Sequence, residues 1–322
     1  MTIGDVRISP SFLVGDVWDK RDIDRKPPAR DNRCMSSRAR APLRIDLAGG
    51  WTDVPAFADA EGGAVVNVAI DRYVRAHLDG DAVLFERDVQ AAGLGSSAAE
   101  HVLAEALRTP DADLDDIAEA AFAAESADGV EGGRQDQYAA CYGGLSYMTF
   151  GRPTPKVGPV KIERLEMPEA HLAALQKRLV LVDSGVARLS GEIHTDVWRA
   201  FARHDDVVTG ALLALKQYAK AMRDAITGSD FGGVREVLNE NWRQQKRLHS
   251  AMTNITVESI FELAMSRGAT AGKACGAGGG GALVFYASSD GDAIALRRAL
   301  TAASITVIDV AFDFEGLVDE DG

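Results

Sequence analysis

Cysteine is scarce in this chain: three of its 322 residues are cysteine, at Cys34, Cys141 and Cys275. They form no Cys-x-x-Cys pair, and none belongs to a Cys/His cluster with the spacing of a zinc site. The sequence therefore argues against a disulfide framework and against a cysteine-ligated zinc centre, which is typical of proteins in a reducing compartment.

Basic residues are also in deficit, with 35 Lys and Arg against 48 Asp and Glu and a formal net charge of -13. A nucleic-acid backbone is held mainly by Lys and Arg, so this balance argues against general nucleic-acid binding. It does not exclude a small anionic ligand. Glycine loops, a few basic side chains and Mg²⁺ can together hold ATP in an acidic protein.

Long apolar runs are missing as well, and the N-terminus lacks a basic region followed by an apolar one. We therefore expect a cytoplasmic protein with no membrane partner. The composition, 46% apolar and 26% charged, is that of a globular protein, and the length favours about two domains.

Glycine and serine gather in one stretch, Ala92-Gly93-Leu94-Gly95-Ser96-Ser97-Ala98-Ala99, which runs directly into a helical pattern. Glycines let the backbone approach a bulky anion, and the first turn of a helix offers unpaired N–H groups and the positive end of its dipole. The stretch is typical of a phosphate-binding loop. An ordinary helix start preceded by a turn is the alternative.

Upstream, residues 41–48 alternate like a half-buried strand that ends in the turn Gly49–Asp53. Polar residues at such a strand end are candidates for ligand binding, here Arg44, Trp51 and Asp53. The alternative is a structural ion pair between Arg44 and Asp53, with Trp51 covering the core.

The remaining pattern indicates an α+β protein. We expect an irregular arm over residues 1–38, a first domain over 39–185 and a second over 186–322, with the Pro-rich segment 152–159 as a competing boundary. Helices are predicted at 100–107, 114–127, 192–204, 207–226, 233–250, 257–267 and 292–303, and strands at 63–70, 145–150, 160–165, 178–183, 282–286 and 305–312.

A second glycine cluster, Gly276–Gly281, contains the letters Gly-x-Gly-x-x-Gly. A dinucleotide fingerprint needs a strand before the loop and a helix after it, whereas we expect a helix before this loop and a strand after it. Residues 268–274 also fail as a Walker A loop, because Ala274 stands where Ser or Thr would meet Mg²⁺. The cluster predicts either a glycine hairpin that faces a ligand or a flexible turn.

Three motifs occur in order: Ala41-Pro42-Leu43-Arg44 leading to Gly49-Gly50-Trp51-Thr52-Asp53, then Gly93-Leu94-Gly95-Ser96-Ser97-Ala98, then Gly276–Ala282. Together they resemble the signature motifs of the GHMP kinase superfamily. The match is most similar to its sugar kinases, the D-glycero-D-manno-heptose 7-phosphate kinases and L-fucokinases, over about residues 38–315. The resemblance implies a GHMP kinase fold, with an N-terminal domain like domain 2 of ribosomal protein S5 and a ferredoxin-like C-terminal domain.

The resemblance also implies roles for single residues. Asp136 matches the base toward the acceptor hydroxyl, and Arg44 a cation beside the transferring phosphate. The ATP loop would be Gly93, Leu94, Gly95, Ser96, Ser97 and Ala98, and Mg²⁺ would be held by Ser97 and Glu125. The sugar would be bound by Trp51, Thr52, Asp53, Gly278, Gly279 and Gly280. A loop-capping role for Asp136 and a solvated helix end for Glu125 are the alternatives.

The chain departs from this family in one segment. Only nineteen residues, Val74 to Ala92, separate Tyr73 from Gly93, where these kinases usually carry several strands and a helix that form much of the adenine pocket. We therefore hold two hypotheses: an ATP- and Mg²⁺-dependent kinase acting on a sugar or sugar phosphate at its anomeric hydroxyl, and a sugar- or nucleotide-binding protein without kinase activity. A mevalonate-type kinase is less favoured, because residues 51–53 follow the sugar-kinase pattern. A homodimer stays open.

Overall fold

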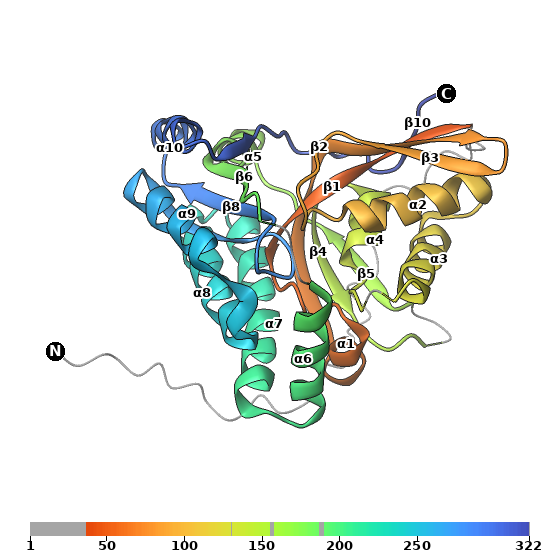
Figure 1. Cartoon of the computed structure of the whole chain (residues 1–322), viewed down its shortest axis with the longest axis horizontal. Helices are drawn as coiled ribbons and strands as arrows, with labels where there is room; N and C mark the ends of the chain where they lie inside the picture. Colours follow the sequence, from red (N-terminus) through yellow and green to blue (C-terminus); the bar gives the residue numbers. More distant parts are fainter. Residues whose placement is uncertain (1–36, 130, 155–157, 187–189, 322) are drawn as a thin grey trace.

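The computed structural model describes residues 37–129, 131–154, 158–186 and 190–321 (Figure 1). The predicted N-terminal arm lies outside the described residues over its first 36 positions, which include Cys34, and so does part of the Pro-rich segment, residues 155–157. No helix in the described part of the chain is long and apolar enough to cross a membrane.

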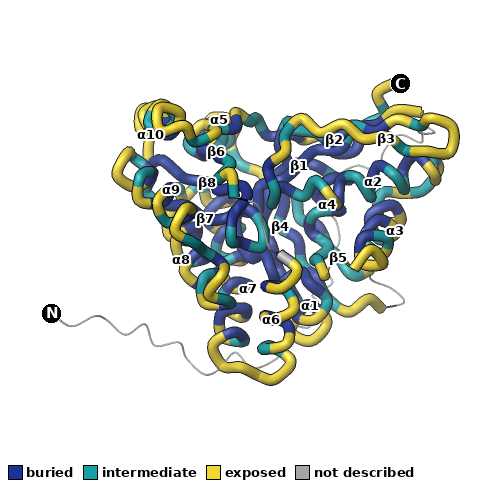
Figure 2. Tube along the Cα trace, in the orientation of Figure 1, coloured by how far each residue is buried: buried dark blue, intermediate teal, exposed yellow. Residues whose placement is uncertain are grey.

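The first sheet is antiparallel in all its pairings and is built around the two longest strands, β1 and β2. Helices α2 and α4 pack on one side of it, and α7 packs on the other. Strand β1 is therefore buried almost throughout (Figure 2). The strands are β1 (Arg38–Ala48), β2 (Gly63–Asp79), β3 (Ala82–Arg87), β4 (Leu145–Phe150), β5 (Val160–Arg164) and β10 (Val318–Asp319).

The helices of this part are short, and α3 packs against both α2 and α4. Helix α3 begins after Asp113, whose side chain accepts from the amide of Asp116, and this cap fixes its start where the acidic residues predicted it. The helices are α1 (Pro55–Glu61), α2 (Ser96–Arg108), α3 (Leu114–Ala127) and α4 (Gln135–Tyr142).

The second sheet has the strand order β7-β8-β6-β9 and is antiparallel throughout. Its strands are β6 (Leu179–Asp183), β7 (Ala269–Ala274), β8 (Ala282–Ala287) and β9 (Thr306–Ile308). Around it and beside the first sheet lie α5 (Glu169–Arg178), α6 (Ser190–Ala202), α7 (Asp206–Thr227), α8 (Phe231–Leu248), η1 (Ser250–Met252), α9 (Ile255–Ser266) and α10 (Asp290–Ala302).

The chain passes between the sheets more than once. Strand β6 pairs with β8 and β9 although it precedes residue 186, and β10 returns to pair with β1. The boundary at residue 186 stays a prediction. Strand β6 precedes this residue but belongs to the second sheet, and β10 follows it but belongs to the first sheet.

The two antiparallel sheets and their covering helices confirm the predicted α+β class, but two local predictions are wrong. A strand, β7, and not a helix leads directly into the second glycine cluster, so the cluster is the turn of the β7–β8 hairpin. The strand expected at 305–312 is limited to β9, because the chain then turns back toward the first sheet and forms a single bridge between Ile70 and Phe312. Helices α1, α4 and α5, the short helix η1 and strands β3 and β10 were not predicted.

Candidate active site

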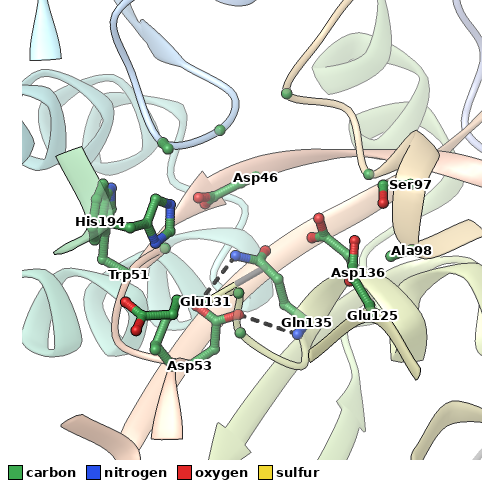
Figure 3. Close-up of a pocket in the computed structure, with 18 of the residues that line it drawn as sticks. Asp46, Trp51, Asp53, Ser97, Ala98, Glu125, Glu131, Gln135, Asp136 and His194 are labelled. Carbon is green, nitrogen blue, oxygen red and sulfur yellow. Dashed lines mark hydrogen bonds between the residues drawn. The ribbon is translucent and has the colours of Figure 1, made fainter. Parts of the chain in front are cut away.

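A cavity of about 580 Å³ opens where the end of β1, the loop before α2 and the start of α4 meet (Figure 3). The end of α3, the first turns of α6 and the second glycine cluster complete its wall. Most of the predicted site residues are among those that line it: Arg44, Trp51, Asp53, Gly93, Gly95, Ser96, Ser97, Ala98, Glu125 and Asp136.

The loop before α2 is shaped to receive an anion. Gly93 and Gly95 have positive φ angles of 89° and 83°, which glycine adopts without strain. Gly95 is the N-cap of α2 and no side chain caps the helix, so the first turn keeps N–H groups for a ligand. Leu94 is fully buried and anchors the loop, and its carbonyl accepts from the Arg44 amide at 3.0 Å.

Arg44 and Asp136 form a bidentate ion pair, with two hydrogen bonds from the guanidinium to the carboxylate. Arg44 Nε donates to Asp136 Oδ1 at 2.8 Å, and Nη2 donates to Oδ2 at 3.0 Å, while Nη1 donates to the Gly93 carbonyl at 2.6 Å. Burial lowers the pKa of Arg44, but the charges of Asp136 and Asp46 more than offset burial, so the pKa is raised overall. Arg44 therefore does not pair with Asp53, and Asp136 is more than a loop cap.

Asp53 is buried and is held by Gln135 at the start of α4. Its Oδ2 accepts from the Gln135 amide at 3.2 Å, and its Oδ1 from Gln135 Nε2 at 3.4 Å. Burial, with the charge of Asp136 as a further cause, raises the pKa of Asp53 to about 7. Gly133 permits this arrangement, because a Cβ there would lie 1.9 Å from Asp53 Oδ2.

Glu125 is also buried, at 8% exposure, and is not a solvated helix end. Gln137 Nε2 donates to its Oε2 at 2.6 Å, and its carboxylate is hydrogen-bonded to Ser97. Burial, with the charge of Asp136 as a further cause, raises the pKa of Glu125. Two mutually repelling carboxyl groups beside a hydroxyl are a favourable place for a divalent cation.

The described residues contain no group of three or more His, Cys, Asp or Glu that could hold a metal ion. A cation at Ser97 and Glu125 would therefore need further oxygen ligands from a bound phosphate chain, which is how Mg²⁺ is commonly held. The donor set fits Mg²⁺ on a nucleotide.

Trp51 adopts a positive φ of 82°, which is rare for a bulky residue and marks a backbone constraint at this turn. Its ring stacks on His194 of α6 with centroids 4.4 Å apart, and both side chains line the cavity. Thr52, by contrast, is fully buried, and its hydroxyl binds the Gly49 carbonyl at 2.7 Å. Thr52 thus holds the turn and does not line the cavity.

The second glycine cluster meets the cavity only through Gly276 and Ala277. Gly278, Gly279 and Gly280 lie against Met252, Ala251 and Val186, respectively. The cluster nevertheless touches the first loop, since the Ala282 amide donates to the Ala92 carbonyl at 2.8 Å. The structure therefore joins the two glycine loops and does not bring residues 278–280 into the cavity wall.

The cavity residues that were not singled out from the sequence include Asp46, Glu131, Gln135 and His194. Asp46 had a signal, because it lies two residues after Arg44 and therefore on the same face of β1. Its partner is Lys273 of β7, fully buried, with Nζ 3.3 Å from Asp46 Oδ1 and 2.7 Å from the Asp46 carbonyl. This ion pair connects the two sheets beside the cavity.

Comparison with known proteins places these features in a family. The model of the GHMP kinases N terminal domain matches residues 64–144, and that of the GHMP kinases C terminal matches residues 219–305. D-glycero-alpha-D-manno-heptose 7-phosphate kinase of Campylobacter jejuni is 28% identical, over 77% of this chain and 88% of that protein.

A second relative is the bifunctional fucokinase/GDP-fucose pyrophosphorylase of Arabidopsis thaliana, which is 23% identical over 85% of this chain. The match spans about a third of that longer protein, 32% of its length. Among solved structures, a D-glycero-D-manno-heptose 1-phosphate kinase from Bacteroides thetaiotaomicron superposes with a TM-score of 0.67, covering 87% of this chain and 97% of its own, at 22% identity. That likeness shows a shared fold.

Proposed function

The chain belongs to the GHMP kinases, and from that membership we propose that it transfers the γ-phosphoryl group of ATP to a hydroxyl of a sugar or sugar phosphate. The observation that carries the proposal is the pairing of Arg44 with Asp136 between the uncapped start of α2 and the cavity wall formed by Trp51 and Asp53. Arg44, which can neutralise phosphate charge, and Asp136, which can act as a base, thus lie between a phosphate-binding helix start and a polar pocket.

In this proposal the acceptor oxygen attacks the γ-phosphorus as the bond to the β–γ bridging oxygen breaks, and ADP leaves. The hydroxyl proton passes to the carboxylate of Asp136, which also orients that hydroxyl. Arg44 stabilises the charge on the transferring group, because its guanidinium stays protonated and retains N–H groups beyond the three that are bonded. The N–H groups at the start of α2 bind the remaining phosphates.

Mg²⁺ would be held by Ser97 and Glu125 together with phosphate oxygens, where it would neutralise phosphate charge. The raised pKa of Glu125, caused by burial and then by the neighbouring Asp136, supports this assignment, since a cation would stabilise both carboxylates.

The anomeric hydroxyl is the proposed acceptor. In the Arabidopsis relative a fucokinase is joined to a GDP-fucose pyrophosphorylase. A pyrophosphorylase of that kind consumes a sugar 1-phosphate, so a kinase joined to it supplies phosphate at that position. The heptose kinase relative acts on a sugar that already carries a phosphate, as its name states.

The direct test is acceptor-dependent ADP release, with ATP, Mg²⁺ and a panel of L-fucose, arabinose, galactose, mannose and heptose 7-phosphate. At least one sugar should give stoichiometric ADP, and Asp136→Asn should slow its release by at least about 100-fold. Absence of sugar-dependent ADP across the panel would contradict the proposal.

A second function, binding of a sugar without kinase activity, is favoured by one observation. The nineteen residues from Val74 to Ala92 are the rest of β2, a two-residue turn, β3 and five residues leading to the phosphate loop. Little chain is left there to enclose a nucleotide base. Calorimetry separates the two functions, because sugar binding with no ATP binding would favour the second.

A further inference from the structure

Among the described residues, the side of the cavity that carries Trp51 and His194 has three carboxyl groups and no Lys or Arg. We propose that the acceptor is an uncharged sugar and not a sugar phosphate. This inference rests on the proposed kinase function and narrows its substrate class. It is carried by the identity, burial and hydrogen bonding of the charged residues that line the cavity.

Three carboxyl groups, those of Asp46, Asp53 and Glu131, line the cavity on the side of Trp51 and His194, away from Ser97 (Figure 3). Among the described residues that line the cavity, Arg44 is the sole Lys or Arg. A phosphate monoester carries about -1.5 to -2 charges at neutral pH. A phosphorylated acceptor would therefore bring a second dianion beside carboxylates.

Arg44 cannot serve both phosphates. Its Nε and Nη2 are bonded to Asp136 and its Nη1 to the Gly93 carbonyl, so its orientation is fixed toward the phosphate loop. Its remaining N–H groups are those that the transferring phosphoryl group uses in the proposed reaction.

The ammonium group of Lys273, which contacts the cavity residue Asp46, is also already paired. The Lys273 side chain is fully buried, and its Nζ binds the carbonyl and lies beside the carboxylate of Asp46. It neutralises Asp46 from behind the cavity wall, since Lys273 itself does not line the cavity.

The same wall suits the hydroxyl groups of a neutral sugar. Asp46 lines the cavity, and its Oδ1 is buried beside Lys273 Nζ, 3.3 Å away, so this carboxylate already has its counter-charge. Asp53 has two oxygens held only at 3.2 and 3.4 Å, so its carboxylate can accept from a ligand as well. Hydroxyl donors satisfy such acceptors, and the Trp51 ring offers an apolar surface to sugar C–H groups.

The test compares matched acceptors that differ by one phosphate: mannose with mannose 6-phosphate, galactose with galactose 6-phosphate, and D-glycero-D-manno-heptose with its 7-phosphate. All retain a free anomeric hydroxyl. We expect the best neutral sugar to exceed its phosphorylated partner by at least about 100-fold in kcat/KM, because like charges juxtaposed at a recognition site are strongly unfavourable.

The Glu131→Lys variant provides a second, independent test of the acceptor preference. Glu131 is exposed at the cavity edge, and reversing its charge should raise kcat/KM for the sugar phosphate relative to the neutral sugar by about tenfold. Glu131→Gln should have a smaller effect in the same direction. Glu236→Lys, on the exposed face of α8 and outside the cavity wall, is the matched control and should leave the ratio unchanged.

The outcomes are distinct. A sugar phosphate used as well as or better than its neutral partner overturns the inference and leaves the kinase function intact, and so does an equal ratio in Glu131→Lys and Glu236→Lys. If no acceptor is phosphorylated, the kinase function fails, and calorimetry with the same pairs decides: binding of neutral sugars alone supports the inference, while tighter binding of the phosphates, or binding of neither, overturns it.

Discussion

Arg44 and Asp136 stand 92 positions apart in the sequence and meet through two parallel hydrogen bonds, 2.8 and 3.0 Å long. One comes from the middle of β1 and the other from the first turn of α4. Their pairing fixes a carboxylate and a guanidinium beside the phosphate loop, and such bidentate pairs are geometrically specific as well as strong.

Asp136→Asn removes the proposed base while keeping the shape of the side chain. We expect kcat to fall by about 10²- to 10⁴-fold, with the KM for ATP changed little, because the loss is felt during proton transfer. Steady-state kinetics with the best sugar measures both constants. Asp111→Asn, an exposed turn position outside the cavity wall, is the control, and equal losses in the two variants would contradict the role of Asp136.

The Asp53 carboxyl gives stability a defined pH dependence. Its pKa is about 7 in the folded protein against 3.8 ordinarily, so the folded state holds this proton more tightly than the unfolded state. Its contribution to the free energy of unfolding is therefore full below about pH 4 and is lost as the pH rises through about 7. We expect Asp53→Asn to gain roughly 3 kcal/mol relative to the parent protein between pH 5 and pH 8.

Urea unfolding of the two ligand-free proteins at both pH values measures this difference. Any constant effect of the Asn side chain cancels in the comparison. A stability difference that does not vary with pH would show that Asp53 titrates near its ordinary value.

Gly133→Ala tests the contact between the loop before α4 and Asp53. The added methyl group would lie 1.9 Å from Asp53 Oδ2 and must displace that carboxylate. We expect the KM for the sugar to rise at least about tenfold with little change for ATP, since small displacements of a binding group are costly. Gly158→Ala, where an added Cβ meets nothing within 4 Å, is the matched control. A rise in the KM for ATP alone would contradict this assignment.

Lys273→Met tests the ion pair that joins the sheets. It leaves the Asp46 carboxylate buried without its counter-charge, which costs about 3–5 kcal/mol of unfolding free energy. The double variant Asp46→Asn with Lys273→Met should lose less unfolding free energy than Lys273→Met alone, because it leaves no buried charge without a partner. Denaturant unfolding checks both, with Lys220→Met on the exposed face of α7 as the control. A double variant less stable than Lys273→Met would refute the pairing.

Glu125→Gln tests the proposed Mg²⁺ ligands. We expect the Mg²⁺ concentration for half-maximal activity to rise on the order of tenfold, because a neutral amide binds a hard dication less well than a carboxylate does. Chelation of Mg²⁺ should abolish activity in both proteins. A titration of activity against Mg²⁺ at fixed ATP measures the shift, and superimposable curves would remove Glu125 from the metal site.

The bounds of a helix could be predicted from the sequence where a capping residue and a regular spacing of apolar residues mark it. Helix α3 was predicted at its observed bounds, because an Asp cap and acidic first turn precede an apolar repeat. Strand β7 was missed because its run of Ala, Thr, Gly and Lys has little strand propensity, and its pairing with β8 comes from tertiary structure. Helix α5 had an overlooked signal, Pro168 before it with Lys177 and Arg178 at its end.

In the candidate site, too, some residues could be predicted from the sequence and others could not. Residues carried by motifs, such as Arg44 and Asp136, could be nominated from the sequence, but their pairing could not be, because an ion pair between Arg44 and Asp53 was equally compatible with it. Asp46 could have been found from its shared strand face with Arg44. His194 had no local signal, since it reaches the cavity only because α6 packs beside Trp51.

Transfer of labelled phosphate from [γ-³²P]ATP to a neutral sugar, with the product identified by NMR, tests the central claim most directly. We predict a sugar 1-phosphate formed in equal amount to ADP, and its loss in Asp136→Asn. Label that stays in ATP or appears only as inorganic phosphate, with every sugar tried, would contradict the account.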